Sequence, residues 1–353
     1  MKRFASIILV LALLLSVVVG CSPAEQAPPV SSSSGDTSSG DETPADDPKP
    51  VETVTMRLAE VHPEGYPTTE ADREFARLVE ERTDGRYKIE VYPGGILGDE
   101  KSVTEQIQFG ALEFGRLSLS PITEFEESLN MLMLPYLYRD KEHMFNVVDG
   151  PIGDNLLVNL EENSGLVGLA WFDAGARSFY NTEREIHSPD DMKGLKIRVQ
   201  ETELMMDLIS ALGASPVSLA YGDVYSALQT GVIDGAENNF PSYESTHHYE
   251  VAKYFTLDEH TRVPELILTS NLVMDKLSDA DKVIFKEAAR EAAILERELW
   301  AEYEKKSEEI IIEAGNIMTR LDSNAEFQER IMPLYDKFGA GYEDLINEII
   351  NTK

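Results

Sequence analysis

Two arginines and an acid–amide pair occupy positions where a predicted α/β unit would bring polar side chains together. Arg198 lies on the polar face of a predicted strand at 196–199, near its carboxyl end, and Arg177 follows an apolar predicted strand. Glu237 and Asn238 end another predicted strand. Ligands of α/β proteins bind beyond the carboxyl ends of strands. This set of residues suits an anionic, polar small molecule better than a protein partner.

The stretch 194–239 is predicted to alternate between strands and helices, and this alternation would position those residues. A helix over 202–212 is expected to end at Gly213. A second helix is expected to begin at Asp223 and to end at Gly231. The predicted order is strand, helix, turn, strand, helix and strand, which is a compact α/β unit.

Further elements are predicted on both sides of this stretch. Strand–helix–strand–helix–strand order in the first third indicates parallel βαβ units. The strand at 165–171 is apolar on both faces and is therefore expected to be central in its sheet. A helix without Gly or Pro at 279–314 would be on the order of 50 Å long, which is enough to brace two domains. The predicted strands are 53–63, 87–93, 112–120, 165–171 and 265–273. The predicted helices are 68–84 (capped at Thr68 or Thr69), 99–109, more than one helix near 141–162, and then 241–255, 279–314, 324–337 and 340–351.

The N-terminus has the pattern of a secretory signal peptide. Lys2 and Arg3 precede an apolar run at 4–19, and Cys21, the only cysteine, follows Gly20. The Val-Val-Gly-Cys run resembles a bacterial lipobox, so Cys21 is predicted to be acylated and to become the mature N-terminus. Cleavage and release without acylation is the alternative.

The composition after the leader indicates a tether and excludes several partners. Residues 22–50 are rich in Ser, Gly, Pro, Asp and Glu, which is typical of a flexible linker. The formal net charge of −33 argues against nucleic acid and against adsorption to anionic lipid. Because such a protein repels anions at long range, an anion site needs concentrated local positive charge.

The sequence shows no motif for a cofactor, a metal ion or covalent catalysis. There is no nucleophile elbow and no phosphate-binding glycine loop. His247 and His248 are adjacent, and neighbouring helical residues do not face each other, so they do not form a metal pair. With 64 acidic residues, two carboxylates placed as in a glycosidase are weak evidence for an enzyme. We therefore expect no enzymatic activity and no cofactor.

Several short motifs follow one another along the chain at characteristic spacings. They are YPGGILGDE (92–100), LPYLY (134–138), GARSFYN (175–181), MKGLKIRV (192–199), GASP (213–216), DVYSALQTGVIDGAEN (223–238) and HTRVPE (260–265). In this order and spacing they resemble the DctP-like extracytoplasmic solute-binding proteins of tripartite ATP-independent periplasmic (TRAP) transporters, and the resemblance runs from about residue 53 to 335.

The resemblance implies a two-domain, periplasmic-binding-protein-like α/β fold with a ligand cleft between the domains. We expect domain I over 51–174 plus 263–302 and domain II over 175–262 plus 303–353. Closure around the ligand would follow from its higher affinity for the closed state.

The resemblance also implies roles for individual residues. Arg198 matches the arginine that pairs with the substrate carboxylate, which agrees with the bidentate fit of a guanidinium to a carboxylate. Arg177 matches a second arginine near that carboxylate, Asn238 an asparagine that hydrogen-bonds it, and Tyr221 an aromatic floor. The further candidates for contacts to ligand hydroxyls or for lining the cleft are Glu100, Ser118, His62, His260, Glu237 and Arg116.

The predicted function is therefore capture of an organic acid outside the cytoplasm and its delivery to a TRAP permease in the membrane. A hexuronate such as glucuronate or galacturonate is the favoured ligand. Sialate or a C4-dicarboxylate is the alternative, and a dicarboxylate would require another cation such as Arg116. A receptor that feeds a signalling kinase and a secreted glycosidase are the alternatives from other classes. We expect a monomer, held by its lipid to the outer face of the cytoplasmic membrane.

Overall fold

The computed structural model describes residues 52–353. The leader, Cys21 and the tether predicted at 22–50 lie outside the described residues. Among the described helices, none has both the length and the apolar character that a membrane span needs.

The first sheet has five strands, of which four run in the same direction and one, β10, runs against its two neighbours. Its order is β2-β1-β3-β10-β4; β1 pairs with β2 and β3 in parallel, and β10 pairs with β3 and β4 antiparallel. The parallel βαβ units predicted from the sequence are confirmed. The strands are β1 (Val54–Ala59), β2 (Tyr87–Tyr92), β3 (Phe114–Ser118), β4 (Leu166–Phe172) and β10 (Glu265–Ser270).

The second sheet has the order β11-β9-β5-β8-β6-β7 and mixes parallel with antiparallel pairs. Its strands are β5 (Arg177–Asn181), β6 (Lys196–Val199), β7 (Ser215–Ser218), β8 (Gly235–Asn238), β9 (Tyr254–Thr261) and β11 (Ile317–Arg320). We use domain I for the first sheet with its helices and domain II for the second sheet with its helices. The chain passes between the sheets at 173–176 and again at 262–264.

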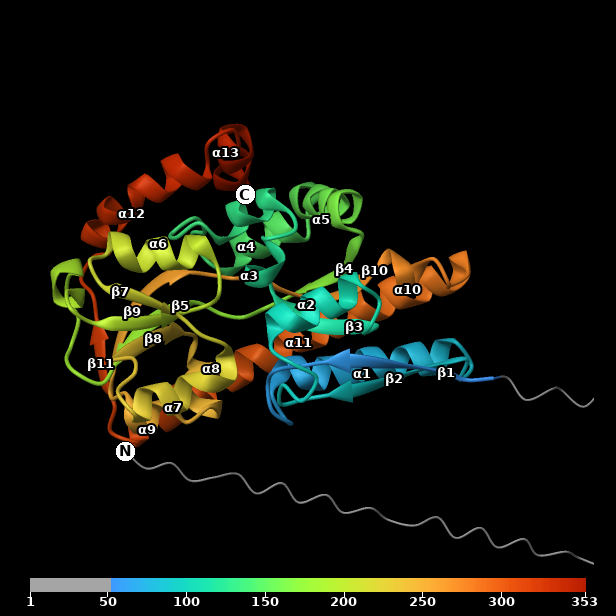
Figure 1. Cartoon of the computed structure of the whole chain (residues 1–353), viewed down its shortest axis with the longest axis horizontal. Helices are drawn as coiled ribbons and strands as arrows, with labels where there is room; N and C mark the ends of the chain where they lie inside the picture. The colour runs from blue at the N-terminus through green and yellow to red at the C-terminus, as the bar shows by residue number, and fades with distance from the viewer. Residues whose placement is uncertain (1–51) are drawn as a thin grey trace, which may run out of the picture. The chain divides into compact units, whose positions relative to one another are not determined.

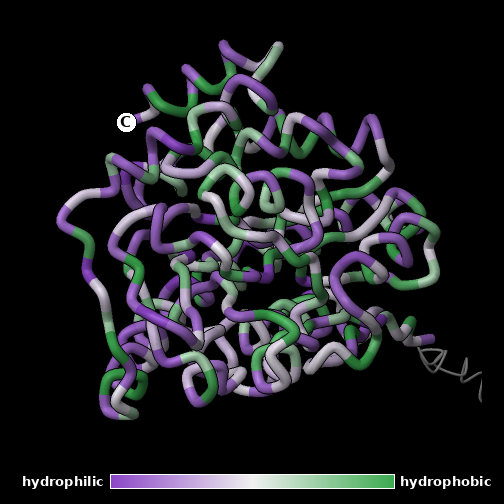
Figure 2. Tube along the Cα trace, turned by 60° about the vertical axis from the view of Figure 1, so that its left-hand side comes forward, coloured by the Kyte–Doolittle hydropathy of each residue, from purple (hydrophilic) through white to green (hydrophobic). Residues whose placement is uncertain are grey.

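The helices lie between and outside these strands (Figure 1). They are α1 (Pro67–Arg82), α2 (Glu100–Gln108), α3 (Leu119–Ile122), α4 (Lys141–Val148), α5 (Pro151–Ser164), α6 (Glu203–Ala211), α7 (Val224–Gln229), α8 (Phe240–Ser245), α9 (His248–Val251), α10 (Asn271–Met274), α11 (Asp279–Glu313), α12 (Ala325–Phe338) and α13 (Glu343–Asn351). Hydrophilic and hydrophobic residues alternate along the chain beside the C-terminus (Figure 2). In α13 the buried residues are Ile346 and Ile349.

The long helix α11 contacts α1 and β4 of domain I and α8 of domain II, so it braces both domains as predicted (Figure 1). Small side chains on its buried face, including Ala288 and Ala292, allow close packing, and Phe285 stacks on Phe114. Burial of this face, and not helix propensity alone, stabilises a helix of this kind.

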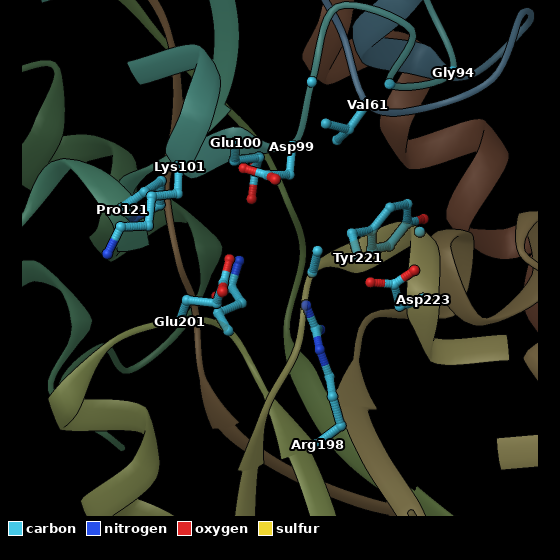
Figure 3. Close-up of a pocket in the computed structure, with 15 residues that line it drawn as sticks. Val61, Gly94, Asp99, Glu100, Lys101, Pro121, Arg198, Glu201, Tyr221 and Asp223 are labelled. Atoms are coloured by element: carbon cyan, nitrogen blue, oxygen red, sulfur yellow. The ribbon is translucent and has the colours of Figure 1, made fainter. Parts of the chain in front are cut away.

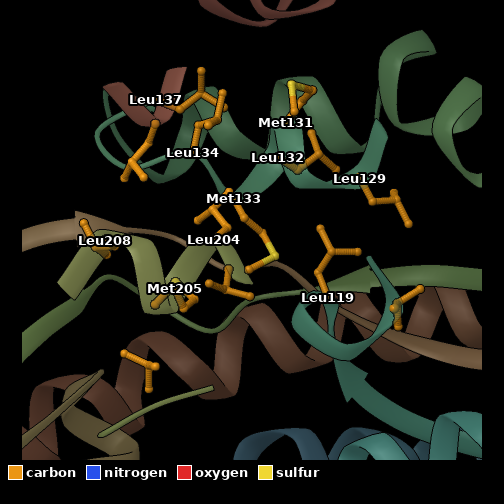
Figure 4. Packing of buried hydrophobic residues seen from close by; sticks show 14 of the residues in the cluster. Leu119, Leu129, Met131, Leu132, Met133, Leu134, Leu137, Leu204, Met205 and Leu208 are labelled. Atoms are coloured by element: carbon orange, nitrogen blue, oxygen red, sulfur yellow. The ribbon is translucent and has the colours of Figure 1, made fainter. Parts of the chain in front are cut away.

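A second apolar cluster joins the domains near the middle of the chain. The segment after α3 enters a 3₁₀ helix, Glu127–Met133, whose leucines and methionines lie opposite α6 (Figure 4). Leu204, Met205 and Leu208 contribute the α6 side of this cluster, and all three are fully buried. This packing explains the apolar run at 131–138, which is too short to span a membrane.

Three predictions about single elements were wrong. The strand at 165–171 is β4, which is the last strand of its sheet and not central. Its two apolar faces are explained by contacts with α5 and α11, because helices can cover both faces of an edge strand. The helix expected at 241–255 is two short helices followed by the start of β9. Arg177 does not follow β4 directly but begins a strand of its own, β5, which was not predicted; β9 and β11 were also not predicted.

The N-terminal cap of α1 also differs from the prediction. The helix begins after Tyr66, with Pro67 in its first turn, where the fixed φ of proline favours a helix start. Thr68 and Thr69 therefore lie inside the first turn and are not the N-cap residue; their hydroxyls donate to Glu60 (2.9 Å) and to the carbonyl of Pro63 (3.0 Å).

Candidate functional site

A cavity of about 270 Å³ lies between the two domains, at the carboxyl ends of β1 and β2 on one side and β6 and β7 on the other (Figure 3). This is the position that the general rule for α/β sheets assigns to ligands. The lining residues are Val61, Gly94, Gly95, Gly98, Asp99, Glu100, Lys101, Pro121, Arg198, Gln200, Glu201, Ala220, Tyr221, Gly222 and Asp223.

Arg198 is the cation at the centre of this cavity. It comes from the middle of β6, and its side chain extends into the space between Tyr221, Glu201 and the Glu100 region (Figure 3). The residue is 3% exposed, and its Nε donates to the carbonyl of Leu219 at 2.9 Å. Among the described residues its other guanidinium nitrogens have no hydrogen bond or ion pair. Burial lowers the pKa of Arg198, but a guanidinium keeps its charge in proteins, so these N–H groups are available to an anion.

Tyr221 forms the aromatic wall beside Arg198. Its ring meets the His62 ring edge-on at a centroid distance of 5.2 Å, and His62 in turn stacks on Tyr66 at 4.0 Å. The Tyr221 hydroxyl is buried and has no hydrogen-bond partner within residues 52–353. Burial raises the pKa of Tyr221 to about 12, so the hydroxyl stays protonated.

Glu100 lies across the cavity from Arg198, at the start of α2 (Figure 3). Its two carboxylate oxygens accept from the backbone N–H (2.7 Å) and the hydroxyl (2.9 Å) of Ser118. The turn before α2 depends on Gly98, whose φ is +131° and where a Cβ would lie 2.4 Å from the Ser102 hydroxyl. The glycine therefore allows this loop to follow the cavity wall while Asp99 caps α2 by accepting from Ser102 N–H.

Arg177 lies in a buried network of domain II and does not line the cavity. Its guanidinium pairs with both carboxylate oxygens of Glu237 (2.5 and 2.8 Å), and its Nη1 donates to Asn238 Oδ1 at 3.0 Å. His260 Nε2 lies 3.5 Å from the same Glu237 carboxylate. Burial opposes ionisation of Glu237, but Arg177 and His260 lower its pKa to about 2. Glu237 thus holds Arg177 in place.

Arg116 is likewise paired with buried acids, in domain I. It is fully buried, and its guanidinium pairs with Glu60 and with Glu265 (2.5 Å). Burial and the neighbouring Arg116 lower the pKa of His62, whose Nδ1 also lies 3.0 Å from Glu60. Since its charge is balanced by these two acids, Arg116 is not free to bind a second ligand carboxylate.

The structure therefore separates the ten predicted residues into three groups. Arg198, Tyr221 and Glu100 line the cavity, and Ser118 reaches it through Glu100. The other six lie in the two buried networks: Arg177, Glu237, Asn238 and His260 in domain II, and Arg116 and His62 in domain I.

Several lining residues were not identified from the sequence. Gln200 and Glu201 follow β6 directly, so the rule that pointed to Arg198 also covers them. Lys101 lies in the first turn of α2 and Asp223 is the N-cap residue of α7, and spacing alone gives no signal that either lines a cavity. Lys101 pairs with Glu124 at 3.1 Å, which leaves Arg198 as the lining cation without an acidic partner in the described part of the chain. No three His, Cys, Asp or Glu side chains among the described residues are arranged to hold a metal ion.

Comparison with known proteins matches the chain to one family. Residues 58–341 match the model of the bacterial extracellular solute-binding proteins, family 7. A solute-binding protein of Chromohalobacter salexigens is 40% identical over 285 residues, which cover 81% of this chain and 84% of that protein.

Two solved structures extend the comparison to three dimensions. A TRAP periplasmic solute-binding protein from Roseobacter denitrificans, with bound β-D-glucuronate, has a TM-score of 0.83 and 40% identity and covers 85% of this chain and 100% of its own. One from Bradyrhizobium, in complex with D-galacturonate, has a TM-score of 0.83 and 41% identity with the same coverage.

Proposed function

Because the chain belongs to the bacterial extracellular solute-binding proteins of family 7, we propose that it captures a hexuronate and delivers it to a TRAP-type permease. The observation that carries the proposal is the unpaired guanidinium of Arg198 in a cavity between two domains. The glucuronate and galacturonate bound by the two similar proteins support the same ligand class.

The charges around the cavity favour a sugar acid over a C4-dicarboxylate. One unpaired cation, Arg198, meets one carboxylate, and the acidic side chains nearby can accept hydrogen bonds from sugar hydroxyls. A dicarboxylate would need a second free cation, and Arg116 is neutralised by its two acids. The volume of about 270 Å³ is near the lower end of small-molecule pockets, roughly 300–1,000 Å³. A six-carbon sugar acid fits this size better than the larger sialate. The acidic lining residues are Asp99, Glu100, Glu201 and Asp223.

Isothermal titration against matched ligands tests this proposal. D-Glucuronate and D-galacturonate should bind, whereas D-glucuronamide, which has the same shape but no charge, should bind at least tenfold more weakly. Malate, succinate and sialate complete the set. Tight binding of a dicarboxylate without binding of either hexuronate would overturn the ligand class and leave the family role intact.

Replacement of Arg198 tests its assignment as the residue that binds the ligand carboxylate. Arg198→Ala should weaken hexuronate binding by about 2–5 kcal/mol, the range for removing one partner of a buried charge pair, which is roughly 30- to several-thousand-fold in Kd. Arg320→Ala, at an exposed ion pair on β11, is the control and should bind as the wild type does. Equal titration curves for Arg198→Ala and the wild type would refute the role of Arg198 in binding the carboxylate.

The same role implies that the ligand is returned unchanged. Incubation with an aryl β-glucuronide should release no phenol, and measurable turnover would favour the glycosidase alternative. Capture for uptake, as opposed to sensing, is supported by the TRAP description of the similar structures; deletion of the cognate permease should then abolish hexuronate uptake.

We further propose that Cys21 anchors the protein to the outer face of the cytoplasmic membrane and that the protein is a monomer. Cells labelled with a radioactive fatty acid should incorporate label into the wild type but not into Cys21→Ser. Sedimentation of the delipidated protein should give the mass of one chain with and without ligand.

A further inference from the structure

A chain of side-chain hydrogen bonds crosses from domain II to domain I at the edge of the cavity. Gln200 follows β6 in domain II, lines the cavity and is 8% exposed. Its Oε1 accepts from the Ser120 hydroxyl at 2.6 Å, and its Nε2 donates to the Ser118 hydroxyl oxygen at 2.9 Å. Both serines belong to the β3–α3 segment of domain I, so one amide connects the two walls of the cleft.

The direction of these bonds is fixed by the number of protons available. The Ser118 hydroxyl donates to Glu100 Oε2 at 2.9 Å, so its one proton is used and its oxygen must accept from Gln200. Ser120 uses its proton on Gln200 Oε1. An uncharged amide can do both, because its oxygen accepts from Ser120 and its NH₂ group donates to Ser118. A carboxylate has no proton to donate to Ser118, and an apolar side chain forms neither bond.

These hydrogen bonds connect the segment that carries Arg198 to Glu100 on the opposite wall of the cavity. Arg198 lies in β6, Gln200 follows directly after this strand, and the side chains of both residues line the cavity. Glu100 is held by Ser118, and Ser118 is held by Gln200. Opening the cleft would separate Gln200 from both serines and expose their polar atoms to water.

We propose that Gln200 is a cross-cleft positioning residue that holds the closed arrangement and fixes Glu100 opposite Arg198. It thereby sets how slowly a bound ligand leaves. The inference rests on the proposed capture of a hexuronate, and it adds a residue that acts through Ser118 and Ser120 instead of through the ligand carboxylate.

Stopped-flow kinetics with D-glucuronate and D-galacturonate tests the inference. Gln200→Met keeps the length of the side chain and removes both hydrogen bonds. Since a hydrogen bond of this type changes an equilibrium by about tenfold, dissociation should become about tenfold faster while association changes less than threefold. Gln200→Glu should have the same or a larger effect, because it removes the donor to Ser118 and adds a charge near Glu100. Gln229→Met, at the exposed end of α7, is the matched control.

A double-mutant cycle separates positioning from a general structural effect. Ser120→Ala should speed dissociation about threefold, and Ser120→Ala combined with Gln200→Met should be no faster than Gln200→Met alone, because both changes break the same bond. Multiplicative effects, or an unchanged dissociation rate in Gln200→Met, would overturn the inference and leave the proposed function standing.

Cleft closure can be measured without reference to any sugar. Spin labels on cysteines at Glu105 of α2 and Ser210 of α6, both exposed, report the distance between the domains in the chain from residue 22 onward. Gln200→Met should shift the distance distribution to longer values, and an unchanged distribution would overturn the inference. If the wild type bound no hexuronate, the proposed function would fail. The distance measurement would then still test, by itself, whether Gln200 holds the cleft closed.

Discussion

His260 offers a quantitative test of the buried charge network in domain II. The residue lies on β9, is fully buried and stacks on Phe179 at a centroid distance of 4.2 Å. Its Nδ1 is 3.0 Å from Asp258 Oδ2, and its Nε2 is 3.5 Å from Glu237 Oε2. Arg177 is the other charged group of the network, on the far side of Glu237. Burial opposes protonation, but the two carboxylates outweigh it and raise the pKa of His260 to about 9.

The magnitude and the sign follow from linkage. A rise from 6.5 to about 9, at 1.36 kcal/mol per unit of pKa, corresponds to about 3 kcal/mol of unfolding free energy. Because the folded protein holds the proton more tightly than the unfolded chain, this stabilisation is complete below pH 6.5 and is lost as the pH rises to about 9. The lowered pKa of Glu237 partly reflects the same His260–Glu237 interaction, so the two contributions are not added.

Urea unfolding followed by tryptophan fluorescence, at pH values from 5.5 to 9.5, measures this contribution. His260→Gln keeps a polar side chain but cannot carry the charge. The difference in stability between the wild type and His260→Gln should shrink by about 3 kcal/mol between pH 6.5 and 9. His187→Gln, at an exposed histidine, should follow the wild-type profile. A difference for His260→Gln that stays constant with pH would show that His260 is not charged and would refute the reasoning.

Two further predictions concern the crossing at 173–176 and the long helix. Gly175→Ala should lower the unfolding free energy by more than the ~1–2 kcal/mol that a left-handed alanine costs, because the new Cβ would lie 3.2 Å from two atoms of the buried Trp300 ring, which has no room to move, as well as 2.7 Å from Glu304 Oε1. Gly194→Ala, with φ +83° and open space around it, is the control, and equal losses for the two variants in urea titration would contradict the steric argument. The unfolding free energy of Glu296→Gln should be within about 1 kcal/mol of the wild-type value at pH 5. Burial raises the pKa of this carboxyl, and its Oε2 only needs to accept from Asp173 N–H, which an amide oxygen can also do. As the pH rises to 8, the stability of the variant should increase relative to that of the wild type. A variant that loses stability relative to the wild type over that range would disprove the neutral state of Glu296.

The sequence predicted the parts of the fold that depend on local periodicity. The alternation in 194–239 gave β6, α6, β7, α7 and β8 in the right order, with Gly213 and Gly231 just beyond the helices at positive φ. It did not predict β5 or β9, whose strands carry charged and polar residues at buried positions, such as Arg177 and Asp258. These strands are held by pairing with distant partners, which no local pattern records.

The site was predicted at the level of residue types but not of their partners. Arg198, Arg177 and Arg116 were all placed near the cleft as potential cations, yet the structure pairs two of them with acids that are far away in the sequence. Glu265 is 149 residues from Arg116, and Glu237 is 60 residues from Arg177. Which arginine stays free therefore depends on tertiary pairing, and sequence spacing could not distinguish the three.

These pairings explain how a chain with a formal charge of −33 can present a site for an anion. Charges on the exposed surface are screened over about 8 Å at physiological ionic strength, so the long-range repulsion contributes little once the ligand has entered the cleft. At close range the interaction is set by Arg198, which is 3% exposed and uses one N–H on a carbonyl. Since the other two buried guanidiniums are neutralised, one carboxylate is attracted and a second is not, and the acidic side chains opposite Arg198 favour the hydroxyl groups of the same ligand.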